Sequence, residues 1–385
     1  MSTPSDKALL PAGLEDVLPP FAAQEAAVVE RLIASFAAHG YQRVKPPLLE
    51  FEEALLAGAG AALTQQTFRL MDPVSQRMMG LRADITPQVA RIAATRLRNA
   101  ARPLRLCYGG QILRVKGSQL RSERQFGQVG VELIGAGQED ADAEVVLLAA
   151  EALNAVDIAH LSIDLNLPPL VGNLCGGIGL EVEQSAALRQ ALDRKDIAAV
   201  AQIAGDRAPL FTALLRATGP ADTALATLGK LSLPKSAKAD IARLRRVVGL
   251  IRAAAPDLTL TIDPVENRGF EYQTGISFII FARDVRGELG RGGRYTTDLP
   301  DGSRESSTGF TLYMDTVQRA LPEPGVPPML YIPAGGAPVD RGRAWREDGW
   351  VTLAGLDEET DVPAAARRLG CSHALIDGRI VELKG

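Results

Sequence analysis

The sequence is poor in the residues on which disulfide-rich and metal-binding proteins depend. Among 385 residues there are 3 histidines and 3 cysteines, and aromatic residues make up only 5%. Cysteines that are far apart and odd in number fit neither a disulfide framework nor a zinc site with paired ligands. The histidines are equally scattered, so neither a metal cluster nor a Ser-His-Asp triad is predicted. We expect structural roles for all of them: Cys107, Cys175 and Cys371 as buried thiols, and His39, His160 and His373.

Long apolar runs and an excess of one charge are also missing. No stretch offers the ~20 consecutive apolar residues that a membrane span requires. Residues 1–18 lack the basic, apolar and small-residue pattern of a secretion signal. The formal net charge of -4 provides no basic field for binding a phosphate backbone. These features predict a cytoplasmic protein that is not attached to a membrane.

The sequence does contain a regular succession of helical and strand patterns. Apolar spacing predicts helices over residues 21–39, 86–97 and 140–154, and strands over 67–73, 75–84, 105–114, 124–135 and 160–167. Thr86 precedes Pro87, as expected of an N-cap residue followed by a proline in the first helical turn. The two strands around the polar segment 116–123 predict a long antiparallel hairpin.

The second half of the chain changes character. Residues 175–258 are rich in Ala, Leu and Arg at helical spacing, which predicts a helical insertion. The glycine-rich segment 287–295 runs between strand patterns and lacks a Lys-Ser or Lys-Thr pair, so a tight turn is expected rather than a phosphate-binding loop. A proline cluster marks a linker at 323–328 between a core of residues 1–322 and a small C-terminal α/β domain of residues 329–385.

One strand pattern separates apolar from polar residues cleanly. Side chains alternate between the faces of a strand, so Val129, Val131 and Leu133 share one face, whereas Gln128 and Glu132 share the other with a glycine between them. The glycine leaves room for a ligand against the sheet. An ordinary outer sheet face is the alternative, and this stretch by itself slightly favours it.

Several charged residues complement these polar groups. Asp84 precedes a helix start, Arg114 ends a strand, and Arg268 begins a strand in which alternation puts Tyr272 and Thr274 on the same face as Arg268. A pocket formed by them holds a carboxylate on Arg114 or Arg268, an ammonium group on Asp84 and a ring N–H on Glu132. Such a pocket suits a zwitterionic, polar amino acid. Surface exposure of the arginines and a helix-end role for Asp84 are the alternatives.

Five ordered segments across residues 8–322 resemble the class II aminoacyl-tRNA synthetases of the histidyl type. They are GYQRVKPPLLEF with Pro47, LRADITP, the hairpin 105–135 with Arg114, NRGFEYQTG with Arg268, and GGRY at 292–295. The resemblance implies an α+β fold with a mixed, mostly antiparallel sheet flanked by helices. It also implies a dimer interface at Pro47.

The departures from this pattern concern ATP. The resemblance calls for a glutamate that holds adenine where Lys116 stands, and for an arginine that holds the γ-phosphate where Thr316 ends the segment Tyr313-Met314-Asp315-Thr316. Loss of such a cation removes most of the electrostatic stabilisation of phosphate chemistry. The tail is also shorter than the anticodon-binding domain of that family and has no obvious basic face, so no tRNA binding is expected.

A histidyl-type core without adenylation resembles the regulatory subunit family of ATP phosphoribosyltransferase. The resemblance implies no catalytic residues, metal or cofactor. It implies a short-form catalytic subunit as partner in the first step of histidine biosynthesis, a homodimer within a larger hetero-oligomer, and histidine as effector. The implied histidine pocket comprises Asp84, Thr86, Arg114, Gln128, Glu132, Arg268 and Tyr272, with Gln273 in place of a second family tyrosine. An active histidyl-tRNA synthetase or related ligase is the alternative function, and a purely structural scaffold is a third.

Overall fold

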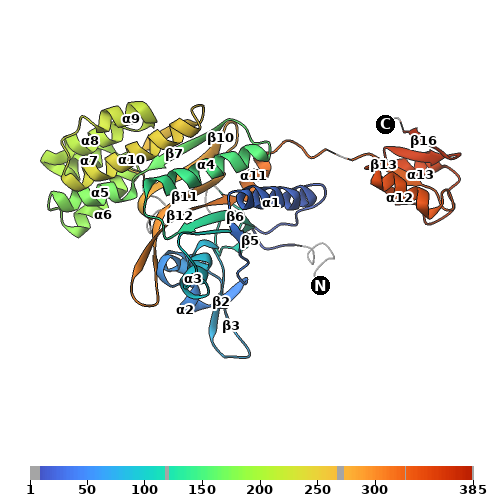
Figure 1. Cartoon of the computed structure of the whole chain (residues 1–385), viewed down its shortest axis with the longest axis horizontal. Helices are drawn as coiled ribbons and strands as arrows, with labels where there is room; N and C mark the ends of the chain where they lie inside the picture. Colours follow the sequence, from blue (N-terminus) through green and yellow to red (C-terminus); the bar gives the residue numbers. More distant parts are fainter. Residues whose placement is uncertain (1–8, 118–120, 267–272, 326, 384–385) are drawn as a thin grey trace. The chain divides into compact units, whose positions relative to one another are not determined.

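The computed structural model describes residues 9–117, 121–266, 273–325 and 327–383 of the chain. The contacts within the chain divide it into two compact units, residues 1–322 and residues 323–385 (Figure 1). All three cysteine thiols are free and buried, as predicted. Among the described residues, no helix combines the length and the apolar character needed to cross a membrane.

A sheet of 9 strands forms the centre of the first unit. In spatial order it comprises β1 (Gln42–Arg43), β5 (Leu104–Leu113), β6 (Gln125–Ile134), β12 (Arg304–Tyr313), β11 (Gly290–Asp298), β10 (Gln273–Ala282), β7 (Leu161–Asn166), β9 (Thr259–Asp263) and β8 (Gly219–Pro220). The pairs β1–β5 and β7–β9 are parallel and the other neighbours are antiparallel. The predicted mixed, mostly antiparallel sheet is therefore confirmed.

Helices cover both faces of this sheet. Helices α1 (Phe21–Ala38) and α4 (Glu139–Ala155) lie on one side and α3 (Thr86–Thr95) lies on the other (Figure 1). On the α1 side, the predicted apolar face of β6 joins the largest hydrophobic core, in which the rings of Phe36 and Phe310 meet edge to face at 5.6 Å. Burial of these apolar side chains is the main force that holds the layers together. The opposite face of β6 carries the polar residues Gln128 and Glu132, flanked by Phe126 and Ile134 of a second hydrophobic cluster.

The start of α3 differs from the prediction by one residue. The N-cap residue is Ile85, and Thr86 is already helical. The Asp84 carboxylate accepts the backbone N–H of Thr86 at 2.9 Å, so Asp84 satisfies the helix end that the Thr86 hydroxyl was expected to cap. The Thr86 hydroxyl is thereby free to contact Tyr108 at 3.2 Å.

The prediction of a tight turn over 287–295 is correct only for the start of this segment and wrong for the rest. Residues 290–295 lie within β11, and the chain reverses before them, where Gly287 has a φ of +97°. A Cβ atom at Gly292 would collide with the carbonyl of Gly309 on β12 and with the ring of Phe278 on β10. Glycine therefore serves close packing between three strands here, a use that local sequence does not distinguish from a turn.

Smaller elements complete the first unit. The predicted hairpin forms a 3-stranded sheet of β2 (Leu49–Phe51), β4 (Met78–Leu81) and β3 (Arg69–Met71), next to α2 (Glu52–Leu55) and the 3-10 helix η2 (Gly58–Gln66). Helix α11 (Met314–Ala320) follows β12. The predicted helical insertion is confirmed, although it already begins at Pro168. It consists of α5 (Pro168–Gly177), α6 (Val182–Asp193), α7 (Ile197–Ala204), η3 (Gly205–Arg207), α8 (Ala208–Arg216), α9 (Ala221–Leu228) and α10 (Lys235–Ala254).

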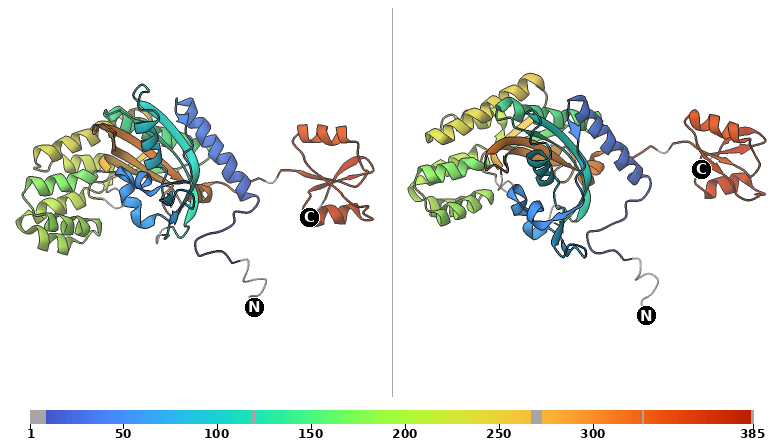
Figure 2. Two further views of the ribbon diagram at one scale, coloured as in Figure 1. Left: turned by 90° about the horizontal axis from the view of Figure 1, so that it is seen from below. Right: turned by 60° about the horizontal axis from the view of Figure 1, so that its bottom comes forward.

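The second unit has a sheet and a core of its own. Its strand order is β14 (Val351–Ala354), β13 (Met329–Ile332), β15 (His373–Ile376) and β16 (Arg379–Glu382), with helices α12 (Val339–Glu347) and α13 (Val362–Arg368). Figure 2 shows the two helices on opposite sides of the sheet. The chain passes from β13 through α12 to β14 on one side of β13, and then through α13 to β15 on its other side. Parallel crossovers of one hand that run in opposite directions place their helices on opposite faces of a sheet.

A buried ion pair fastens α4 to β11 and allows a test of the fold. The Arg294 guanidinium donates to the Asp142 carboxylate at 3.0 Å and to the Ala136 carbonyl at 2.7 Å. The two charged side chains are only 3% and 4% exposed. We expect Asp142→Ala to lower the free energy of unfolding by about 3–5 kcal/mol, because it leaves a buried cation without its partner.

Urea denaturation measures this difference. The matched control is Asp298→Ala, which removes an ion pair with Arg304 whose side chains are 57% and 73% exposed, and which should cost less than about 1 kcal/mol. Equal losses in the two variants would contradict the structural role of the buried pair.

Candidate functional site

A narrow cavity of about 30 Å³ opens on the polar face of the sheet, on the side of α3. Three of the predicted ligand-binding residues lie in its wall: Asp84 and Thr86 from the start of α3, and Glu132 from β6. The other lining residues are Gln273, Arg291, Gly292, Gly293, Tyr295, Gly309, Phe310, Thr311 and Tyr313. Residues distant in sequence therefore meet where β6, β12, β11 and β10 run side by side.

Glu132 lies at the bottom of this site with only 1% of its surface exposed. Tyr295 donates its hydroxyl to the carboxylate at 2.8 Å, and Tyr108 does so at 3.4 Å. The carboxylate fits only because its cross-strand neighbour is Gly309, where a Cβ atom would collide with it. Burial is the main cause that raises the pKa of Glu132 to about 8; the negative charge of Asp84 adds to the rise and the hydroxyl donors oppose it.

A chain of hydroxyl groups connects the two sides of the cavity. Tyr108 Oη lies 3.2 Å from the Thr86 hydroxyl and 2.5 Å from the Thr311 hydroxyl. Tyr108 is fully buried and lies over Gly130, where a Cβ atom would collide with its phenol oxygen. Asp84, Thr86 and Glu132 are thus held in fixed positions around one small polar space.

Two further predicted residues support the site instead of lining the cavity. Gln128 is fully buried and its Oε1 accepts the Ile85 backbone N–H at 3.0 Å, which positions the start of α3. Arg114 is half-buried and donates to the Ala83 carbonyl at 3.3 Å. Arg268 and Tyr272 lie outside the described residues. Pro47 is exposed and its carbonyl accepts the Gln88 amide at 2.8 Å.

Gln273 takes a place that simple alternation did not predict. The sequence placed it on the face opposite to Thr274, with Thr274 on the side of the expected ligand residues. In the structure Gln273 lines the cavity and Thr274 is exposed. The register of β10 against β11 shifts between Gln273 and Ser277. Strict alternation of side chains along the strand therefore does not predict the position of Gln273. Within the described part of the chain, the buried Oε1 of Gln273 has no hydrogen-bond partner.

Sequence reasoning did not assign roles to Tyr108, Tyr295 and Thr311, although they hold the carboxylate and the hydroxyl chain. Glycines in the neighbouring strands were the available signal for these residues. Each glycine makes room for a large side chain from the strand beside it. No cluster of three or more His, Cys, Asp or Glu residues suited to a metal ion is found in the part of the chain that the structure describes.

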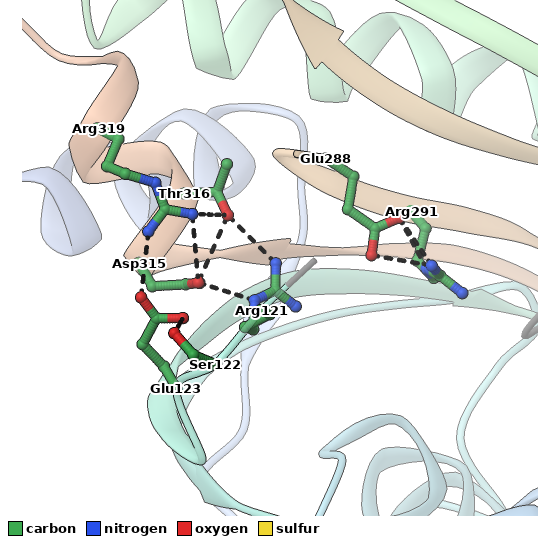
Figure 3. A network of polar contacts seen from close by, with 8 residues as sticks. All are labelled: Arg121, Ser122, Glu123, Glu288, Arg291, Asp315, Thr316 and Arg319. Carbon is green, nitrogen blue, oxygen red and sulfur yellow. Dashed lines mark hydrogen bonds and ion pairs between the residues drawn. The ribbon is translucent and has the colours of Figure 1, made fainter. Parts of the chain in front are cut away.

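A second polar network lies where the β5–β6 loop meets α11 (Figure 3). Arg121 donates to Asp315 at 2.7 Å and to the Thr316 hydroxyl at 3.2 Å. Arg319 donates to the same hydroxyl at 3.1 Å and pairs with Glu123 at 3.4 Å. The part of this loop that leads into β6, residues 121–124, is called the loop arm. The ion pairs Arg121–Asp315 and Arg319–Glu123, whose arginines both donate to the Thr316 hydroxyl, fasten the loop arm to α11.

Comparisons with known proteins agree with this architecture. The family described as histidyl-tRNA synthetase matches residues 13–317. One similar solved structure is described as an ATP phosphoribosyltransferase regulatory subunit/histidyl-tRNA synthetase from Bacillus halodurans C; it has a TM-score of 0.81 at 24% identity and covers 94% of this chain and 96% of its own. A histidine–tRNA ligase subunit from Alicyclobacillus acidocaldarius has a TM-score of 0.63 at 26% identity, over 81% and 97% of the two chains. The family match and the fold together define a class II synthetase core of the histidyl type.

Sequence relatives refine this classification. A protein from Rhodospirillum centenum is 58% identical over 98% of this chain and 97% of its own, and one from Paramagnetospirillum magneticum is 56% identical over 100% of both. Both are named ATP phosphoribosyltransferase regulatory subunit. The chain belongs to the family of ATP phosphoribosyltransferase regulatory subunits.

The raised pKa of Glu132 predicts a pH-dependent stability. Between its ordinary pKa of 4.5 and the folded value of about 8, the folded chain holds a proton that the unfolded chain releases. The stabilisation of the folded state by this proton is complete below pH 4.5. It is lost as the pH rises to about 8, which lowers the free energy of unfolding by up to about 4 kcal/mol. We expect Glu132→Gln, which carries no charge at any pH, to abolish this loss.

Urea unfolding measured from pH 5 to pH 9 provides the comparison. Glu53→Gln, at a side chain that is 82% exposed, is the control and should retain the pH profile of the unmodified chain. An unchanged profile in Glu132→Gln would show that the carboxyl group is not held protonated.

Proposed function

We propose that this chain is a non-catalytic regulatory subunit that binds a short-form catalytic subunit of ATP phosphoribosyltransferase, supports its activity in the first step of histidine biosynthesis, and lets histidine inhibit it. The observation that carries the proposal is the similarity over nearly the whole chain, at 56–58% identity, to relatives named as this subunit. The cytoplasm is the compartment of such a subunit.

The groups near the β5–β6 loop support the absence of adenylation. Lys116 is exposed on this loop, at the position where the synthetase pattern has a glutamate. Thr316, at the position of the phosphate-binding arginine, is only 1% exposed and is engaged by Arg121 and Arg319. A triphosphate needs cations that face it in the transition state, and the threonine hydroxyl supplies none.

The polar groups that line the cavity, and not its volume of about 30 Å³, support the binding of histidine. Glu132 offers a buried acceptor for a ring N–H, and Asp84 offers a negative charge for an ammonium group. Arg114, which contacts the backbone next to Asp84, and Arg268 supply the charge for a carboxylate. A cationic imidazolium favours the ionised form of Glu132, so binding of this form and deprotonation of Glu132 are coupled.

Inhibition by histidine requires a difference between two arrangements of the complex. Histidine must bind the inhibited arrangement more tightly than the active one, by a coupling of ~1–3 kcal/mol. The exposed segment around Pro47 is the proposed contact between two copies of the chain within the larger hetero-oligomer. Transfer RNA has no part in this assembly.

Co-purification with a short-form catalytic subunit tests the proposal. We expect a stable complex whose phosphoribosyltransferase activity requires this chain and falls when histidine is added. Histidine-dependent exchange of pyrophosphate into ATP by the isolated chain, at the rate of a synthetase, would instead identify an active histidyl-tRNA synthetase or related ligase. The absence of heat on titration with histidine, with and without the catalytic subunit, would indicate a scaffold.

Asp84→Asn tests the amino-acid pocket directly. The substitution keeps an oxygen that can accept the Thr86 N–H but removes the negative charge, so we expect histidine binding to weaken about tenfold to a hundredfold. The measurement is isothermal titration calorimetry. Asp301→Asn is the matched control, because Asp301 accepts the N–H of Ser303 at 2.9 Å in the same local geometry, on an exposed turn. Equal affinities in the two variants would place histidine elsewhere.

A further inference from the structure

The arginine of the β5–β6 loop lies in a corner formed by two aromatic rings. The guanidinium carbon of Arg121 is 3.9 Å from the ring centroid of Tyr313 and 4.6 Å from that of Phe126. The two rings stand nearly at right angles, at 83°, with their centroids 5.8 Å apart. Tyr313 also lines the cavity that contains Glu132, so the corner and the cavity are neighbours.

Polar groups complete this corner. Asp315 accepts from Arg121 at 2.7 Å and the Thr316 hydroxyl accepts at 3.2 Å. The side chains of Arg121 and Asp315 are both 9% exposed. In the described part of the chain, the buried Oδ1 of Asp315 has no hydrogen-bond partner. Two aromatic faces with a carboxylate and a hydroxyl are the groups that recognise a planar, nitrogen-rich ligand.

The burial of Arg121 distinguishes this arrangement from an ordinary surface arginine. Removing a guanidinium from water is costly unless its hydrogen bonds and aromatic contacts are satisfied together. The pair of Arg319 with Glu123, which the structure places beside Thr316, keeps the loop arm in the same position (Figure 3). The chain thus carries a built site for a planar group and fills that site with its own side chain.

We propose that Arg121 acts as an internal ligand in this aromatic corner and that its presence keeps purine nucleotides out of the core. The inference rests on the proposed function and deepens it, because it explains how an amino-acid cavity persists next to a position that takes no ATP. It also implies that the substitutions Lys116→Glu and Thr316→Arg, which introduce the residues of the synthetase pattern, do not restore nucleotide binding. An arginine at position 316 would stand among Arg121 and Arg319 at a position that is 1% exposed.

Arg121→Ala in the full-length chain tests the inference. Its removal opens the corner, so ethylguanidinium should bind the variant and raise its Tm, while leaving the Tm of the unmodified chain unchanged. Adenosine should bind the variant as well, because its ring can stack on Tyr313 and its amino group can donate to Asp315. Purine riboside, which has a hydrogen atom in place of that amino group and no N1–H, should bind at least about tenfold more weakly, since a buried acceptor is then left unpaired.

Two further variants make the result decisive. Arg124→Ala is the matched control, because Arg124 is on the same loop arm but lies over Phe68, with its guanidinium 5.2 Å from that ring; it should bind none of the three compounds. Arg121→Met fills the corner without charge and provides a folded comparison if Arg121→Ala is unstable. It should bind ethylguanidinium no better than the unmodified chain, yet lose the pairing with Asp315 and melt at a lower temperature.

The outcomes separate this inference from the proposed function. A folded Arg121→Ala variant that binds neither ethylguanidinium nor adenosine, or an unmodified chain that binds adenosine equally well, would overturn the internal-ligand role. Retention of histidine binding and of the catalytic partner by that same variant would leave the proposed function intact. Failure of the unmodified chain to bind either histidine or the partner would overturn the proposed function instead.

Discussion

The site depends on one steric constraint, which is that large polar side chains lie across glycines of neighbouring strands. Tyr108 lies over Gly130, the carboxylate of Glu132 lies over Gly309, and Gln273 lies over Gly293. A Cβ atom at any of these glycines would collide with the polar side chain beside it. Because the glycines provide this room, polar groups lie flat within the interior of the sheet and can be nearly or fully buried without separating the strands.

Burial then determines the chemistry of each group. Glu132 is surrounded by hydroxyl groups and removed from water, so its pKa rises to about 8 and the carboxyl group carries a proton near neutral pH. Asp84 is closer to solvent and its carboxylate also satisfies the end of α3. The two acidic side chains in this cavity therefore differ in burial and in hydrogen-bond partners. This difference suits a ligand that carries both a cationic and a ring N–H group.

In the neighbouring network around Arg121, a buried charged side chain occupies the space between two aromatic rings. Burial of the Arg121 guanidinium is tolerated because Asp315, Thr316 and two aromatic rings replace the water that it loses. The cavity on the polar face keeps a space of about 30 Å³, whereas the adjacent corner is filled by the side chain of Arg121. Under the proposed function, the core retains recognition of a small zwitterion and gives up its activation.

Patterns along the chain predicted the order of helices and strands, the helical insertion, and the alternation that puts Gln128 and Glu132 on the face of β6 opposite to Val129, Val131 and Leu133. These properties depend on local periodicity and on residue type, which are read directly along the chain. Contacts between distant segments, in contrast, were needed to learn that Gln128 supports α3 instead of lining the cavity, that Gln273 faces inward, and that Arg121 is buried between two rings. The reason is that strand register, a shift within β10 and the packing of a loop against α11 join residues far apart in sequence, and no local pattern encodes those distances.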